Sequence, residues 1–567
     1  MKANNNTPAS SINPFQFNAG FTQQNAQTAS ATAGNPFASL LLGWPAGGAV
    51  SYTVASAFQQ IYEGLFIQDD WRVTPKLTIN LGLRWEYEAP MSERYNRQNA
   101  GFDFNSTNPL QSQVTGLTLK GGLLFTSSSD RLPFNRDLNN WGPRVGASYR
   151  LFNNTVIRGG FGTNYSVTFQ TGGNTGYSAS TGYVSSNDAG LTPANGLANP
   201  FPGGVLVPTG SSLGLSTQLG QGFTFADPDR TIPKVYNYSL AIQQQLPGQL
   251  LLEVAFAGNY ATQLSVSKAI NALPRSFYAL PGYANPVPST TLLAQVPNPM
   301  AGKLPGSSLN NSTIAYQSLQ VPYPEFGGIT ESTHSIGKSL YNSLQVSMEK
   351  RLKAGLQGRF SFTWNKIMQE TSYLNDQDDW SQLARVQAGE PSKVATLSLS
   401  YSLPILANRK GLIHNLFGGW EANGILRYLN GSLISAPSGV YSTGINPKLD
   451  NQTYQQWFNT CTLNSSGVRQ NCADANQPVA FIQPPSYTLR TLSGVLPGIR
   501  TEVPTTVDFS MFKTFQVHER AKLQFRANAY NLANTPVFGA PSSTSGVVGI
   551  GQVNDPRIVE LALKLNF

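Results

Sequence analysis

The last eleven residues, Arg557 to Phe567 (RIVELALKLNF), alternate between two kinds of side chain. Successive side chains of an extended strand point to opposite faces, so one face here is apolar throughout. That face carries Val559, Leu561, Leu563, Leu565 and Phe567, and the opposite face carries Glu560, Ala562, Lys564 and Asn566. Such a strand suits a membrane barrel with lipid outside and water inside, and equally a half-buried strand of a soluble sandwich.

The same alternation recurs along the chain in pairs of segments. In residues 64–90 (GLFIQDDWRVTPKLTINLGLRWEYEAP), two alternating runs flank a turn at Thr74 to Lys76. Further pairs turn near residues 152–154, 247–249, 353–355 and 518–520. Counting such runs predicts about 14 strands, joined as an antiparallel meander.

The connections between these runs are of two kinds. Short turns alternate with long Gly-, Ser-, Asn- and Pro-rich loops, among them residues 166–233, 265–338, 432–504 and 534–556. An outer-membrane barrel has tight periplasmic turns and long external loops, whereas a sandwich has no reason to keep its long loops at one end. We therefore expect an all-β fold, an antiparallel transmembrane up-and-down β-barrel, with Phe567 ending in the periplasm.

Composition excludes several other classes of protein. Charged residues make up 12% of the 567 residues and aromatics 11%, with 53 Gly, which favours strands and polar loops over a helical or nucleotide-binding enzyme. The net charge of +9 comes from scattered Lys and Arg, so we expect no nucleic-acid partner. Basic residues in outer loops would instead meet lipopolysaccharide phosphates. No apolar run approaches the roughly 18 residues of a spanning helix.

The domain organisation follows from the same patterns. Residues 1–60 form a loop-rich segment with room for one strand near residues 15–21, and residues 61–567 form the barrel. Pro and Gly in Gly34 to Gly48 (GNPFASLLLGWPAGG) favour an irregular loop over a helix. No signal peptide is visible at the start, which predicts an upstream start or a C-terminal fragment.

Catalytic signatures are absent from the sequence. It contains no GxxxxGK[ST], HExxH or CxxC motif, so we expect no enzyme and no cofactor. We also expect no metal site, because none of the histidines His334, His414 and His518 lies near a cysteine. Cys461 and Cys472 share a polar loop, which favours a local disulfide over two unrelated thiols. The alternation makes Arg84, Glu86, Glu560 and Lys564 candidates for the lumen wall.

Several phrases together resemble a known family. They are QDDWRVTPKLTINLGLRWEYEAP, NWGPRVGASYR with TVIRGGFGTNY, LPGQLLLEVAFAGNYATQL, YNSLQVSMEKRL with FTWNK, and LQFRANAYNLANTPVFGAP before the terminal RIVELALKLNF. In this order they resemble the β-barrel of TonB-dependent transporters, in particular the Oar-like branch, from about residue 34 to the end.

This resemblance implies an outer-membrane uptake receptor with roughly 22 strands, more than the chain shows. It also implies a plug through which the TonB complex delivers energy, and a C-terminal aromatic strand recognised by the outer-membrane assembly machinery. No plug or TonB-contacting segment is visible in this sequence. The alternatives are a passive porin or adhesin-type outer-membrane barrel and, from another class, a secreted β-rich carbohydrate-binding protein.

Overall fold

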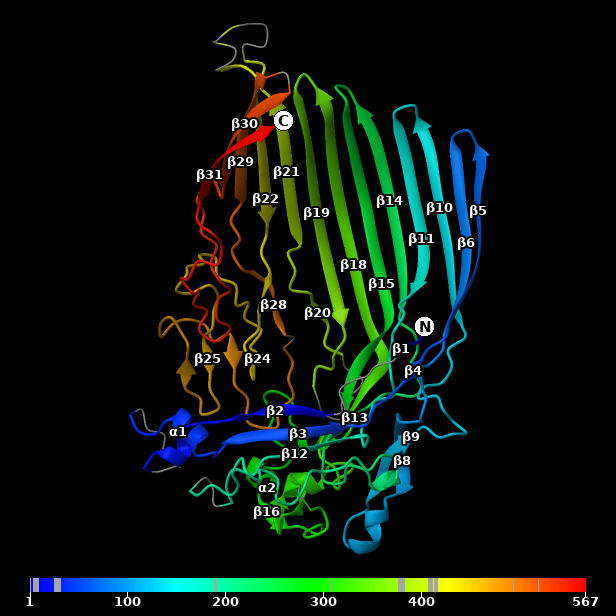
Figure 1. Cartoon of the computed structure of the whole chain (residues 1–567), viewed down its shortest axis with the longest axis vertical. Coiled ribbons are helices and arrows are strands. Elements are labelled where there is room, and N and C mark those ends of the chain that lie inside the picture. Colours follow the sequence, from blue (N-terminus) through cyan, green and yellow to red (C-terminus); the bar gives the residue numbers. More distant parts are fainter. Residues whose placement is uncertain are drawn as a thin grey trace.

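One antiparallel sheet dominates the computed structural model of the chain (Figure 1). The structure describes residues 2–3, 10–24, 32–187, 191–305, 307–375, 383–405, 411, 413, 417–492, 494–518 and 520–567. Thirteen long strands follow one another across the sheet in chain order, each antiparallel to its neighbours. They are β5 (Tyr62–Thr74), β6 (Leu77–Glu88), β10 (Asn140–Phe152), β11 (Thr155–Tyr165), β14 (Lys234–Leu246), β15 (Leu250–Ala269), β18 (Ile329–Lys353), β19 (Leu356–Glu370), β21 (Lys393–Ser402), β22 (Trp420–Leu429), β29 (Thr506–His518), β30 (Ala521–Tyr530) and β31 (Ile558–Asn566).

The remaining elements are short and lie in the connections. The strands are β1 (Lys2–Ala3), β2 (Ser10–Gln16), β3 (Gly47–Thr53), β4 (Phe58–Gln59), β7 (Ser92–Glu93), β8 (Asn99–Thr107), β9 (Lys120–Phe125), β12 (Ser178–Gly182), β13 (Phe223–Phe225), β16 (Gln295–Pro297), β17 (Thr313–Ala315), β20 (Val386–Gln387), β23 (Leu433–Ser435), β24 (Tyr441–Ser442), β25 (Thr462–Leu463), β26 (Arg469–Gln470), β27 (Phe481–Ile482) and β28 (Val495–Arg500). The helices are α1 (Pro36–Leu41) and α2 (Ser289–Leu292), with single-turn 3₁₀ segments η1 (Gly20–Thr22), η2 (Pro109–Gln113), η3 (Gly214–Ser216), η4 (Arg275–Phe277), η5 (Ser308–Asn310) and η6 (Tyr316–Leu319). Neither helix in the described part of the chain has the length and apolarity to cross a membrane.

The register gives the sheet one apolar and one polar face. Side chains of directly paired residues share a face, so a chain of pairs can be followed from strand to strand. One such row is Leu81, Val145, Phe161 and Tyr238, and it is apolar. The row one residue along is Asn80, Gly146, Gly160 and Ser239, and it is small and polar. A sheet with these two faces suits a boundary between lipid and water.

Tight turns join the strands at one end of the sheet, the upper end in Figure 1. Between β18 and β19 the turn residues are Ala354 and Gly355, with φ of 53° and 78°. Two successive residues with positive φ form the type of turn whose twist matches a hairpin, and glycine adopts it most easily. At Gly355 an added Cβ would also lie 2.6 Å from the carbonyl oxygen of Ser402, so the neighbouring strand approaches closely.

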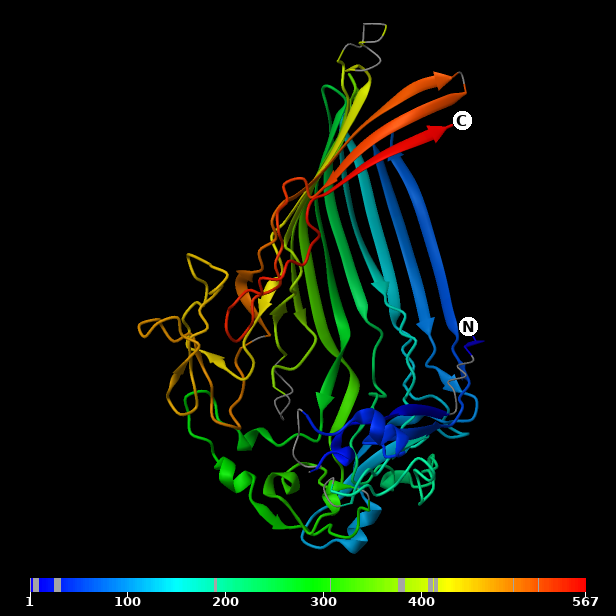
Figure 2. The same ribbon diagram turned by 60° about the vertical axis from the view of Figure 1, so that its left-hand side comes forward.

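The long connections gather at the opposite end of the sheet and pack into a common mass, which we call the loop cap (Figure 2). It consists of residues 89–139, 166–233, 270–328, 371–392, 430–505 and 531–557, as far as they are described. Three of these connections share a buried cluster: Phe102, Leu123, Phe223, Phe225, Ile270, Tyr323 and Phe326, together with Ile329 at the start of β18. A second cluster joins residues 434–499 to Val548. The long loops are therefore ordered by their own cores.

The N-terminal segment differs from its expected form. It contains four short strands, β1 to β4, where the alternation left room for one, and β3 pairs with both β2 and β12. A helix, α1, occupies part of the phrase expected to be irregular. Its cause is local: the Asn35 side chain accepts a hydrogen bond of 2.8 Å from the Phe37 backbone N–H, and Pro36 takes the first helical position.

The strand count is close to the expected value of about 14. The path has thirteen strands, and β13 and β20 add short pairings with β18 and β19. Within the described residues β5 and β31 are the two edges of the sheet and do not pair with each other. The final strand thus ends the sheet in this structure.

A charge placed on the apolar face of the sheet tests whether that face lies against lipid. Leu344 lies in the middle of β18 on the apolar face, and Gln345 is its neighbour on the polar face. We expect Leu344→Arg to lower the free energy of unfolding in lipid vesicles by about 2–4 kcal/mol, because a lipid-facing guanidinium is costly near mid-membrane. Gln345→Arg is the matched control and should change it little. Equal effects of the two substitutions in urea unfolding followed by tryptophan fluorescence would contradict the assignment.

Candidate functional site

A single row of residues crosses the polar face in the half of the sheet near the loop cap. The register pairs Gly82 with Arg144, Arg144 with Gly162, and Gly162 with Asn237. It continues from Asn237 to Asn259 and from Asn259 to Tyr341. Gly82 and Gly162, the two direct partners of Arg144, have no side chains, so the Arg144 side chain lies over their backbone. An added Cβ at Gly162 would be 3.3 Å from Arg144 Cγ.

This row forms the floor of a depression of about 560 Å³. The polar side chains that line it are those of Arg144, Asn164, Asn237, Tyr238, Ser239, Asn259 and Tyr341. The Arg144 guanidinium donates a hydrogen bond of 2.6 Å to Asn164 Oδ1. A guanidinium beside several amides and hydroxyls can hydrogen-bond hydroxyl, carbonyl or carboxylate groups of a polar solute. Glycine in a strand is typical where a ligand or another backbone approaches closely.

Arg84 and Glu86, two of the expected lumen residues, form an ion pair on the polar face of β6. Arg84 also donates a hydrogen bond of 3.2 Å to the Tyr62 hydroxyl on the neighbouring strand. Their side chains are 30% and 15% exposed, so the pair is held against the wall rather than extended into solvent.

Glu560 and Lys564 lie on the same polar face but at the other edge of the sheet. The Asn528 side chain donates a hydrogen bond of 3.1 Å to Glu560, and Lys564 lies opposite Gln524. Ten strands separate β31 from β6 along the sheet, so the structure does not bring the four expected residues into one site. They remain two separate pairs.

The outward apolar side chains of β31 and the terminal Phe567 are among the most exposed of the described residues. Val559, Leu561, Leu563, Leu565 and Phe567 are 64%, 69%, 69%, 56% and 98% exposed. Large apolar surface on an edge strand is a strong signal for a covering lipid or protein surface.

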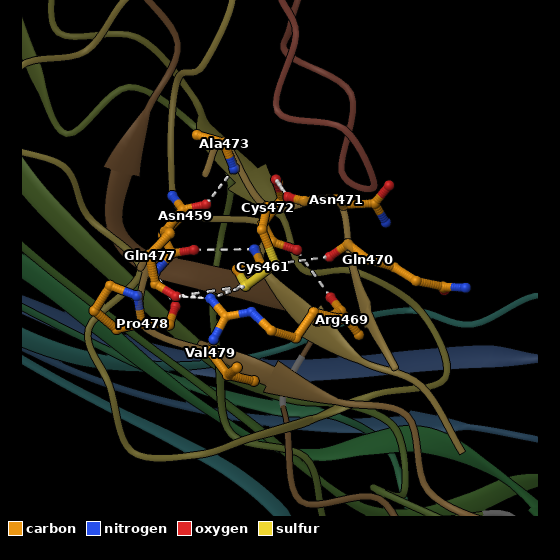
Figure 3. Close-up of a disulfide and its surroundings, with 12 residues drawn as sticks. Asn459, Cys461, Arg469, Gln470, Asn471, Cys472, Ala473, Gln477, Pro478 and Val479 are labelled. Atoms are coloured by element: carbon orange, nitrogen blue, oxygen red, sulfur yellow. Dashed lines mark hydrogen bonds between the residues drawn. A yellow bond between two sulfur atoms is a disulfide. The ribbon is translucent and has the colours of Figure 1, made fainter. Parts of the chain in front are cut away.

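Cys461 and Cys472 are joined by a disulfide with an S–S distance of 2.05 Å (Figure 3). Cys461 is fully buried and its backbone N–H donates a hydrogen bond of 2.9 Å to Asn459 Oδ1. The Arg469 guanidinium donates to the Gln477 carbonyl oxygen and lies 3.5 Å from Cys461 Sγ. The bond therefore fastens a small polar loop onto the buried cluster that contains Phe458 and Phe481.

Glu325 is a buried ionisable residue of the loop cap that no sequence pattern marks. Its side chain is fully buried. The Gly220 N–H donates a hydrogen bond of 2.8 Å to the backbone carbonyl oxygen of Glu325. Burial raises the pKa of the Glu325 carboxyl from 4.5 to about 7, and the positive charge of Lys120 opposes the rise.

Arg144 was missed as well, because only the register across six strands shows that glycines and amides surround it.

The family can now be identified. The chain matches the model of the outer membrane beta barrel domain over residues 1–560 and therefore belongs to this family. It is accordingly a protein of the cell outer membrane that crosses the bilayer with strands. No curated protein matches the chain.

Several solved outer-membrane proteins are similar to it at low identity. The ferric-catecholate import receptor Fiu of E. coli K12 is 12% identical, with a TM-score of 0.38, over 92% of this chain and 50% of that one. The outer membrane transporter YddB of Escherichia coli is 9% identical, with a TM-score of 0.39, over 92% and 54%. The ferripyoverdine receptor of Pseudomonas aeruginosa is 11% identical, with a TM-score of 0.36, over 92% and 39%. The chain thus spans about half of their length or less, and at such TM-scores they add nothing to the family assignment.

Removing the disulfide should loosen one loop without unfolding the barrel. The two cysteines are 11 residues apart, and closing a loop of this size stabilises by roughly 2–3 kcal/mol through the unfolded state. We expect the double variant Cys461→Ser/Cys472→Ser to be cut faster by protease within residues 432–504, with heat-modifiable barrel retained. Reduction of the wild-type protein should have the same effect. Unchanged protease resistance would show that the bond contributes nothing to the order of this loop.

The buried carboxyl predicts a pH dependence of the loop cap. Because the pKa of Glu325 is raised in the folded state, its stabilisation is complete below about pH 4.5 and is lost as pH rises through about 7. Between pH 5 and pH 8 we expect the cap to lose stability on the order of 3 kcal/mol, seen as a lower unfolding temperature in detergent. Glu325→Gln should abolish this difference, and a variant that keeps it would assign the effect to another group.

Proposed function

We propose that this chain is the barrel of a TonB-dependent uptake receptor for a polar ligand. The observation that carries the proposal is the loop cap: long connections with shared buried clusters suit ligand capture better than the open mouth of a passive pore. The row around Arg144 then gives the ligand a polar path along the wall. The resemblance of the strand phrases to TonB-dependent transporters points the same way.

Three partners belong to this proposal. TonB, acting through a plug, supplies the energy; lipopolysaccharide phosphates meet basic residues of the outer loops; and the outer-membrane assembly machinery recognises the strand ending in Phe567. In the proposed protein, Arg84, Glu86, Glu560 and Lys564 line the lumen, while the apolar side chains of β31 face lipid. The proposal includes no enzymatic step.

Uptake by living cells tests the proposal. We expect cells lacking this gene to stop depleting a particular polar compound from rich medium, as measured by mass spectrometry of the supernatant. Cells lacking TonB function should fail on the same compound, because transport against a gradient needs that energy source. Continued depletion without TonB would favour the passive porin, and recovery of the protein in the soluble fraction without detergent would favour the secreted carbohydrate-binding protein.

A substitution of Arg144 tests whether the depression around this residue takes part in uptake. Arg144→Gln should reduce depletion of the compound several-fold at an unchanged amount of protein in the outer membrane. Arg150→Gln changes the same residue type on the same face of β10, near the tight-turn end, and serves as the control. Equal uptake by both variants would remove the depression from the proposed path.

A further inference from the structure

β13 runs alongside the start of β18 next to the loop cap (Figure 1). Three side chains with metal-ligating atoms lie close together there. They are Asp227, Glu331 and His334, and their ligand atoms all lie within 4.8 Å of one another. His334 Nδ1 is 3.4 Å from Asp227 Oδ2 and 3.3 Å from Glu331 Oε1. Glu331 is the most buried of the three, with 7% of its side chain exposed.

A β-bulge makes this arrangement possible. Residues three apart in a regular strand point to opposite faces, so Glu331 and His334 should diverge. The pairing of β18 with β15 joins His334 to Val266 and Glu331 to Lys268, with a register shift between them. Three steps on β18 are thus matched by two on β15. An extra residue of this kind re-aims side chains, and it brings these two to a common side.

Asp227 reaches them from another connection of the cap. β13 runs parallel to the start of β18, pairing Phe225 with Glu331, and Asp227 follows two residues later. The Asp227 N–H donates a hydrogen bond of 2.7 Å to Thr333 Oγ1. Asp227 Oδ1 accepts a hydrogen bond of 2.9 Å from the Asp229 N–H. These bonds leave Oδ2 turned toward His334. Fixing of a ligand by neighbouring hydrogen bonds is typical of metal sites.

The distances separate a metal site from a plain ion pair. Hydrogen bonds between charged groups are about 2.7–2.9 Å long, so 3.3 and 3.4 Å are too long for strong ones. Two ligands bound at roughly 2.0–2.2 Å to one tetrahedral ion lie roughly 3.3–3.6 Å apart. The spacing therefore fits two ligands of a common ion.

The charges around the cluster also call for a cation. The side chains of Asp227 and Glu331 are 16% and 7% exposed, and Lys268 Nζ, 3.7 Å from Glu331 Oε2, compensates one of the two carboxylates. The hydroxyl of Tyr373 is buried and has no hydrogen-bond partner among the described residues. Burial raises the pKa of Tyr373, and the charge of Glu331 adds to the rise, so this phenol lies within electrostatic reach of the cluster.

We propose that Asp227, Glu331 and His334 bind a divalent transition-metal ion such as Zn²⁺. One imidazole and two carboxylates suit this class of ion better than Mg²⁺ or Ca²⁺, which prefer oxygen ligands alone. Three protein ligands leave a fourth position for water or for a group of a bound solute. The ion ties the connection 166–233 to the sheet. This site was not expected from the sequence, where only histidines near cysteines were considered.

Calorimetry on the full chain tests the proposal. Protein purified from outer membranes in detergent is stripped with EDTA and titrated with ZnCl₂. We expect one ion to bind per chain and to raise the unfolding temperature. His334→Ala and Glu331→Gln should each weaken binding at least about tenfold, since even outer partners of metal ligands cost that much. CaCl₂ should produce no comparable binding.

His518→Ala is the matched control, because His518 lies at the tight-turn end of β29. It should bind zinc as the wild type does. Folding of each variant is checked by heat modifiability, and Glu331→Gln keeps the shape of the side chain if His334→Ala fails to fold. The proposal is overturned if folded wild-type protein takes up no zinc, or if both ligand variants bind it with wild-type affinity.

Discussion

Hydrogen-bonded pairing of the backbone between neighbouring strands governs this fold. Inside a bilayer no water is available to backbone N–H and C=O groups, so each must find a partner in a neighbouring strand. Thirteen strands in chain order satisfy this requirement, because each interior strand pairs with the long strand before it and the long strand after it. The same pairing fixes the register, and the register decides which side chains face lipid and which face water. It also makes unpaired edges costly, which applies here to β5 and β31.

The long connections lie where this constraint ends. Beyond the membrane the connections are free to differ, and they are stabilised by their own buried clusters, by the Cys461–Cys472 disulfide and by pairings such as that of β13 with β18. Buried charge occurs there as well. Glu325 lies in the cap and Glu331 lies next to it, so the stability of the cap depends on the protonation of Glu325 and, as proposed above, on a cation bound beside Glu331.

The sequence predicted the features that depend on neighbours in the chain. The hairpin of residues 64–90 is found as β5 and β6, and the placing of Arg84 and Glu86 on one face follows from period two alone. The short turns and long loops also fall at opposite ends as expected. The features that could not be predicted depend on segments distant in the chain or on a single helix-capping residue. Asn35 alone turns a Pro- and Gly-punctuated phrase into a helix, and a bulge on β18 unites Glu331 with His334 against the normal alternation. The surroundings of Arg144 are visible only after six strands have been aligned.

In the membrane, one face of this sheet meets lipid and the other meets water. Single cysteines at positions 344 to 349 of β18 would test it directly, with the native cysteines held in their disulfide. Each is labelled in native outer membranes with a water-soluble maleimide, and in parallel with a fluorophore quenched by spin-labelled lipid. We expect strict alternation, with lipid quenching at 344, 346 and 348 and aqueous labelling at 345, 347 and 349. Uniform labelling along the strand, or labelling with the opposite phase, would contradict the two-faced sheet.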